Sequence, residues 1–118
     1  MTVLRWQNRN LSQAFLPTTT ATFYEPPGGV YAQFERLIIT NTETSLAAGG
    51  LDWEVYIDLA GTGYGTANLY LNGTLASRRS VIVPINGIIF QDPCNIGIRS
   101  NTANKLIAIG TIQERTVA

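Results

Sequence analysis

Residues 51–59 carry the clearest pattern in the chain, an unbroken alternation of apolar and polar side chains. The apolar positions are Leu51, Trp53, Val55, Ile57 and Leu59. The polar positions between them are Asp52, Glu54, Tyr56 and Asp58. Because successive side chains of a β-strand point to opposite faces, this segment is predicted to be a strand with one face toward a core and the other toward water. On a helix the same apolar residues would be spread around the whole circumference.

Weaker segments of the same kind follow along the chain, separated by turn residues. Strands are expected at residues 21–24, 33–41, 67–72, 74–77, 80–85, 95–99 and 105–115, and residues 88–90 are a short apolar run that Asp92-Pro93 ends. In the segment 33–41, one face is predicted to carry Phe34, Arg36, Ile38 and Thr40. The other face receives Glu35, Leu37 and Ile39. Both faces of this segment and of the last one are partly apolar, which indicates strands in the middle of a sheet.

Two Asn-Gly pairs mark expected turns. Asn72-Gly73 lies between two short β-prone runs, and this dipeptide is the strongest local signal for a two-residue β-hairpin. Asn86-Gly87 predicts a second turn. With seven or eight expected strands, spaced as in sandwiches, and no convincing helix, the chain is predicted to be all-β. The predicted architecture is an antiparallel, jelly-roll-like β-sandwich.

Residues 1–20 differ from the rest of the chain. Their apolar residues are sparse and follow no strand alternation, and Pro17 with the three threonines after it closes the segment. We interpret residues 1–20 as an extended N-terminal arm, with one helical turn near residues 11–15, and residues 21–118 as the β-sandwich domain. Two roles remain open for the arm, since it can pack on its own domain or reach a neighbouring subunit.

Composition limits the kinds of partner that the protein is expected to have. The 118 residues carry zero formal net charge, and seven of the eight basic residues are scattered arginines, so no basic stripe predicts nucleic-acid binding. Arginine also suits partly buried ion pairs and subunit contacts better than lysine does. No apolar run approaches the ~20 residues of a membrane span, and the N-terminus lacks the apolar core of a signal peptide. Synthesis in a reducing cytoplasm is therefore expected, with no membrane partner.

The residue types exclude several kinds of chemistry. The chain has no histidine and one cysteine, so histidine-dependent catalytic triads, common zinc sites and an intrachain disulfide cannot be built. Cys94 is interpreted as a small half-buried filler. Residues 61–65 resemble a phosphate-binding loop only in their glycines, because a strand-like segment follows them instead of a helix.

Three carboxylates on the polar face of residues 51–59 are the remaining candidates for chemistry. Asp52, Glu54 and Asp58 are spaced as carboxylates of glycosidases or calcium sites can be. The favoured interpretation is that they keep the face soluble or pair with arginines of a neighbouring strand. The arginines considered are Arg36, Arg78 and Arg79. No cofactor, metal ligand or catalytic residue is therefore assigned, and the protein is expected not to be an enzyme.

Residues 23–29 read Phe-Tyr-Glu-Pro-Pro-Gly-Gly, and the strand that follows ends in Ile-Thr-Asn-Thr at residues 39–42. These two features, and the order of the expected segments, resemble those of small virion structural proteins of tailed phages. The alternating strand, the hairpin segment, the run before Asp92 and the last strand, ending near Glu114, continue the similarity. The double proline and double glycine depart from the pattern, as does the segment Asp92-Pro93-Cys94-Asn95.

The resemblance implies a virion protein without catalytic residues, a capsid decoration (cement) protein that bridges subunits of the major capsid protein or other virion proteins. It also implies a homo-oligomer, with a trimer favoured. The residues expected at interfaces are Arg5, Trp6, Arg9, Phe15, Arg78 and Arg79. The alternative is a tail, fibre or baseplate component that binds a receptor glycan through Trp53, Tyr64 or Tyr70. A third possibility, an enzyme acting through Asp52 and Glu54, is the least favoured.

Overall fold

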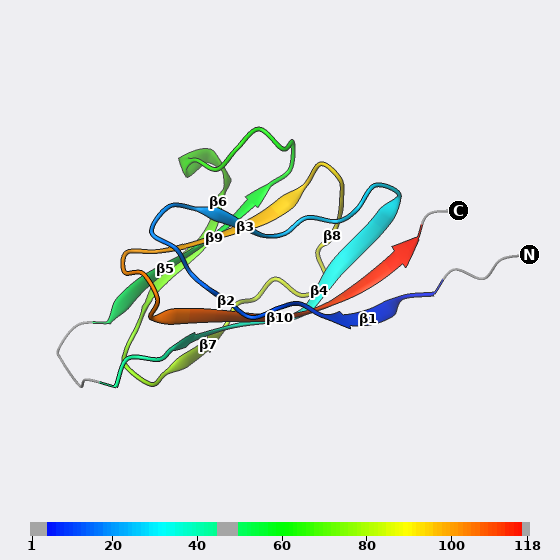
Figure 1. The fold of residues 1–118 in the computed structure, drawn as a ribbon. Helices are drawn as coiled ribbons and strands as arrows, with labels where there is room; N and C mark the ends of the chain where they lie inside the picture. The colour runs from blue at the N-terminus through cyan, green and yellow to red at the C-terminus, as the bar shows by residue number, and fades with distance from the viewer. Residues whose placement is uncertain (1–4, 45–49, 117–118) are drawn as a thin grey trace, which may run out of the picture.

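The computed structural model describes residues 5–44 and 50–116, so parts of the expected arm (1–4), loop (45–49) and domain (117–118) lie outside the described residues. Within the described ranges the chain forms ten strands and one short 3-10 turn, η1 (Figure 1). In chain order they are β1 (Gln7–Asn10), β2 (Ala14–Phe15), β3 (Ala21–Tyr24), β4 (Val30–Asn41), β5 (Leu51–Asp58), η1 (Thr66–Asn68), β6 (Leu69–Leu75), β7 (Ser80–Ile82), β8 (Ile89–Gln91), β9 (Asn95–Ser100) and β10 (Leu106–Thr116).

The strands form two antiparallel sheets that pack against each other (Figure 1). The six-stranded sheet has the order β1-β10-β4-β7, with β2 also paired with β10 and β8 also paired with β4. The four-stranded sheet has the order β3-β9-β5-β6. This arrangement confirms the predicted all-β sandwich, whereas the jelly-roll form stays a prediction.

The core lies between the two sheets and takes side chains from both. Its fully buried apolar residues include Leu16, Phe34, Leu37, Ile39, Val55, Ile96, Ile98, Leu106 and Ile112. The rings of Tyr24, Phe34 and Phe90 pack together at centroid separations of 5.9 to 6.1 Å. Removal of this apolar surface from water is the main force that holds the sheets together.

One sequence-based strand prediction is confirmed at the centre of each sheet, β10 in the six-stranded sheet and β5 in the four-stranded sheet. β10 lies between β4 on one side and β1 with β2 on the other, as expected for a strand that is apolar on both faces. On β5, Trp53 and Val55 face the core, as the alternation predicted. The expectation for Leu59 is wrong, because β5 ends at Asp58 and Leu59 is 71% exposed.

A β-bulge corrects the predicted faces of β4. Thr111 is paired with Arg36 and Ile112 with Phe34, so Glu35 is an extra residue without its own partner on β10. The bulge shifts the alternation by one residue. Phe34 is therefore buried on the same side as Leu37, whereas the prediction placed it with Arg36.

The predicted hairpin at Asn72-Gly73 is wrong. Both residues lie inside β6, which pairs with β5 through Asn72 and Glu54 and through Gly73 and Trp53. A Cβ atom at position 73 would come within 2.9 Å of the Trp53 indole. The glycine therefore makes room for a large ring on the neighbouring strand, and its use here is packing instead of turn formation.

The described part of the expected arm is attached to the six-stranded sheet. Residues 7–10 pair with residues 111–114 of β10, and Ala14 and Phe15 pair with Ala108 and Ile107. The expected helical turn is wrong, because residues 14–15 form a strand. Leu16 has no exposed surface, which anchors the segment in the core.

Candidate functional site

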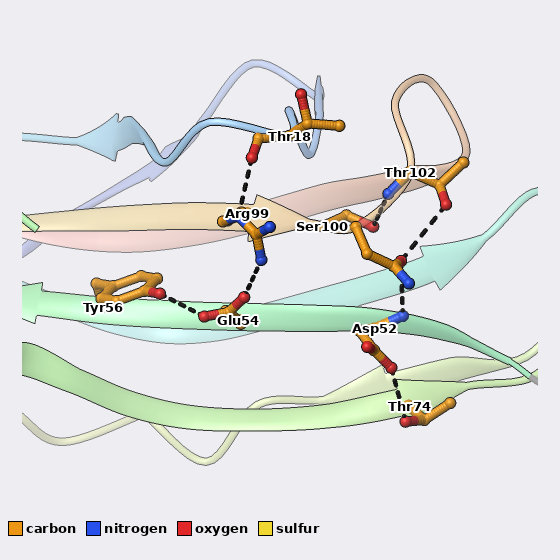
Figure 2. A network of polar contacts seen from close by, with 9 residues as sticks. Thr18, Asp52, Glu54, Tyr56, Thr74, Arg99, Ser100 and Thr102 are labelled. Atoms are coloured by element: carbon orange, nitrogen blue, oxygen red, sulfur yellow. Dashed lines mark hydrogen bonds and ion pairs between the residues drawn. The ribbon is translucent and has the colours of Figure 1, made fainter. Parts of the chain in front are cut away.

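The predicted carboxylate face of β5 lies on the outer side of the four-stranded sheet, and its polar groups form two separate sets of contacts, one around Glu54 and one around Asp52 (Figure 2). Glu54 forms an ion pair with Arg99 of β9 and accepts a hydrogen bond from the hydroxyl of Tyr56. The Nε atom of Arg99 donates to the carbonyl of Thr18 at 2.8 Å. The hydrogen bond to Glu54, followed by burial, raises the pKa of Tyr56 and keeps its proton in place. The expected pairing with an arginine therefore exists, but the partner is Arg99.

Asp52 occupies the other end of this face. Its Oδ1 atom accepts a hydrogen bond from the hydroxyl of Thr74 at 3.0 Å, and its backbone N–H donates to Asn101 at 3.1 Å (Figure 2). A shallow depression of about 260 Å³ lies here. It is lined by Asp52, Trp53, Glu54, Asn72, Gly73 and Thr74. The depression is polar and open, which suits water or a weakly bound polar group.

Asp58 does not belong to the open face, contrary to the prediction. It is 2% exposed, and its two oxygens accept hydrogen bonds from the backbone N–H groups of Thr62 and Gly63 at 3.2 and 2.8 Å. The loop that contains Thr62 and Gly63 follows the end of β5, so these two hydrogen bonds to Asp58 hold the loop in place. In residues 5–44 and 50–116, no three cysteine, aspartate or glutamate side chains are placed to hold one metal ion.

The three aromatic residues considered for glycan binding do not form one platform. The Trp53 ring is buried over Gly73, and the Tyr64 ring packs on Gly97, where a Cβ atom would come within 2.5 Å of it. The Tyr64 hydroxyl is hydrogen-bonded to Asn95, and burial raises its pKa. Of these three residues, Tyr70 has the most exposed side chain.

Cys94 is more buried than the half-buried filler that the sequence predicted, with 3% of its surface exposed. Burial is also the main cause of the raised pKa of its thiol. Since the thiolate is the reactive form, this environment lowers its reactivity. After residues 61–65 the chain forms η1, a single turn of three residues, before β6 begins. A turn of that length supplies no helix dipole for phosphate.

The predicted interface residues fall into two groups at opposite ends of the six-stranded sheet. One group contains Arg5, which is exposed, and Trp6 and Arg9. The guanidinium of Arg115 lies between two rings, 5.1 Å from the Trp6 centroid and 5.4 Å from the Tyr31 centroid. Arg9 forms an ion pair with Glu114 at 3.4 Å. Trp6 and Arg9 therefore already contact their own domain.

Phe15, Arg78 and Arg79 form the second group. Phe15 is 48% exposed and pairs with Ile107, near the start of β10. Arg78 and Arg79 lie in the turn before β7, where the Arg78 backbone N–H donates to the Asn41 carbonyl at 3.0 Å and Arg78 has a φ of 61°. Phe15 pairs with Ile107, whereas Arg9 pairs with Ile112 and Trp6 lies against Arg115. The two groups are therefore about 17 to 26 Å apart along β10 and do not form one site.

Sequence reasoning missed a row of isoleucines on the outer face of the six-stranded sheet. Ile109, Ile38 and Ile82 are directly opposite one another on β10, β4 and β7. Ile109 is 38% and Ile82 65% exposed. Ile38 and Ile109 lie on the two strands that the pattern placed in the middle of a sheet, and Ile82 lies on a third predicted strand. Only the order of the strands shows that the outer side is uncovered by the described residues.

Comparison of the chain with protein-family models, with curated proteins and with solved structures finds no match. None of the helical segments in the described ranges is long and apolar enough to cross a membrane.

Proposed function

We propose that the protein is a non-enzymatic virion structural protein of a tailed phage, a decoration or cement protein that stabilises the head by bridging capsid subunits. The order of sequence patterns supports the phage assignment. The observation that carries the structural role is the exposed apolar surface on the six-stranded sheet, formed by Phe15, Ile109, Ile82 and their neighbours. Monomeric proteins rarely expose contiguous apolar surface of this kind unless it contacts a partner.

The contacts of the β5 carboxylates support a role without catalysis. Glu54 is engaged by Arg99 and Tyr56, and Asp58 by two backbone N–H groups. A general acid or base needs a reachable carboxyl group with a proton affinity suited to transfer. Groups held by internal partners instead stabilise the sandwich.

The proposed mechanism is mechanical and multivalent. Several copies, joined in an oligomer, attach to neighbouring capsid subunits. Once one copy is bound, the others are held at a high local concentration near their sites, so that weak contacts together give a high overall affinity. The exposed Arg5 and Arg9 and the partly exposed Trp6 lie at one end of the molecule, where they are accessible to the capsid. Phe15, Arg78 and Arg79 lie at the other end, so one molecule has two separated contact regions.

Attachment to particles tests this proposal. Purified protein is added to phage heads that lack it, the heads are sedimented, and the bound protein is measured per head. We expect saturable binding that the variant R5Q/R9Q weakens and the control K105Q leaves unchanged. Deletion of residues 1–20 is unsuitable because it removes Leu16 from the core and exposes the edge of β10. Absence of the native protein from intact particles, or binding that both variants leave intact, would contradict the proposal.

The depression beside Asp52 favours a second candidate, a tail, fibre or baseplate component that binds a receptor glycan. Asn72 supplies an amide and Thr74 a hydroxyl, and both groups can form hydrogen bonds with the hydroxyls of a sugar. This function predicts saturable binding on a glycan array that N72A and T74A reduce. Glycan binding without attachment to heads would favour this candidate over the first.

A further inference from the structure

The outer face of the six-stranded sheet has an apolar region that extends beyond one row. Ile109, Ile38 and Ile82 are adjacent across three strands, and Ile107 and Phe15 form the next row along β10 and β2. We call these five residues the isoleucine face. Thr40 and Ser80 complete the second row and are hydrogen-bonded to each other at 2.8 Å.

The outer face of the sheet is large enough to supply most of one side of a stable interface. The six strands of the sheet contain 35 residues, and at about 4.8 Å between strands and ~3.3 Å per residue they give the outer face roughly 550 Å² in projection. A standard protein interface takes ~800 Å² from each partner. Such an interface has an apolar centre and a polar rim, and the isoleucine face with its polar neighbours has this composition.

The polar part of the same face suits a second copy of itself. Asn8, Gln113 and Gln33 form a row of side-chain amides across β1, β10 and β4, joined by hydrogen bonds of 3.0 and 2.7 Å. Amides both donate and accept, so two such rows are complementary. Between this row and the isoleucines lie Glu35 and Arg36, which are exposed and of opposite charge. Two copies therefore meet there without net charge repulsion.

We infer that two copies of the chain pack face to face through the isoleucine face. The twofold axis lies in the interface, along the strands and midway between β10 and β4. This symmetry places Ile109 of each copy opposite Ile38 of the other, and Thr111 opposite Arg36. Sheets packed in this way cross at about 30°, so the closest contacts are at the isoleucines.

The inference deepens the assembly role proposed above, because it names the partner that covers one surface. It is tested on purified protein alone, whereas attachment to heads is tested on particles, so either can fail without the other. The predicted species has twice the 12.9 kDa mass of the chain.

Sedimentation equilibrium of the full chain, from nanomolar to high micromolar concentration, tests the inference. The variant I82E places a charge within the isoleucine face, on the edge strand β7 and on a side chain that is 65% exposed, so folding should be little affected. We expect a dimer for the unmodified chain and at least a tenfold higher Kd for I82E. The matched control L59E adds the same charge at a residue that is 71% exposed and lies away from this sheet, and should leave the Kd unchanged.

Circular dichroism and thermal unfolding check that both variants remain folded. If I82E does not fold, I109Q serves as the second variant, since it removes the apolar contact without adding charge. A monomer at every concentration would overturn the inference and leave the face to another protein. A trimer, or a dimer whose Kd neither I82E nor I109Q changes, would also overturn it.

Discussion

The indole ring of Trp53 lies over Gly73 of the neighbouring strand, where a Cβ atom would come within 2.9 Å of Cζ2 and 3.0 Å of Cε2. Contacts that short require the ring or the strand to move. Trp53 is buried and lies in a strand that is paired on both sides, so neither can move easily. The absence of a side chain at position 73 is therefore a requirement of the core.

The substitution Gly73→Ala is expected to lower the free energy of unfolding by about 1–3 kcal/mol, measured by urea denaturation, because it overpacks the Trp53 ring. Gly65→Ala is the control, since position 65 has extended backbone and nothing within 4 Å of a Cβ atom. It should change stability by less than about 0.5 kcal/mol. The double variant W53L/G73A should lose less than the sum of the two single losses, and simple additivity would contradict the proposed contact.

Asp58 and Asp52 occupy the same strand but are predicted to respond differently to replacement. Asp58→Ala leaves the N–H groups of Thr62 and Gly63 without their acceptor and should cost about 2–3 kcal/mol. Asp52→Ala removes an exposed hydrogen bond with Thr74 and should cost about 0.5 kcal/mol. Chemical denaturation measures both, and equal losses would show that Asp58 does not fix the loop.

The bulge at Glu35 predicts an uncommon tolerance to deletion. Removing Glu35 leaves Phe34 opposite Ile112 and Arg36 opposite Thr111 in a regular ladder, so both faces of β4 keep their residues. The deletion variant should fold, with a loss of about 1–2 kcal/mol from the changed twist. Deleting Ile38 instead forces Leu37 or Ile39 onto the outer face and should prevent folding. Circular dichroism and solubility distinguish the two, and similar behaviour of both variants would contradict this account.

Tyr24 predicts a loss of stability at high pH. Burial first, and then the hydrogen bond that it donates to Glu114, raise the pKa of its hydroxyl above the usual value of about 10. A raised pKa in the folded state contributes stability that is complete below pH ~10 and is lost as the pH rises toward the folded pKa. The free energies of unfolding of the unmodified chain and of Y24F, measured between neutral pH and pH ~11, should therefore converge. A constant difference between them would contradict this assignment.

The sequence was informative where local pattern and tertiary environment agree. Trp53 and Val55 reach the core as their alternation predicts, and β10 is central as its two apolar faces predict. The turn predicted at Gly73 failed because a local turn signal competed with a packing requirement on another strand. The faces of β4 were misassigned because a single unpaired residue, Glu35, reverses every later position, and nothing in the sequence marks it.

The site was less predictable than the fold, because its contacts join distant parts of the chain. The pairing of β9 with β5 brings Arg99 to Glu54, 45 residues away in sequence, and no spacing rule selects that arginine over Arg36 or Arg78. The exposure of Ile109 and Ile82 likewise depends on which side of the sheet is uncovered. Alternation shows that two faces exist but does not show which face a second sheet covers.

The pairing of β1 with β10 also constrains how the protein can be made. Arg9 and Glu114 face each other although 105 residues separate them, so a ribosome releases the first strand long before its partner. During synthesis the early segment has to wait, unpaired, until nearly all of the domain has emerged. Closure of the six-stranded sheet is therefore a late, long-range event, and nascent chains that stall before β10 would present an unprotected edge to chaperones and to one another.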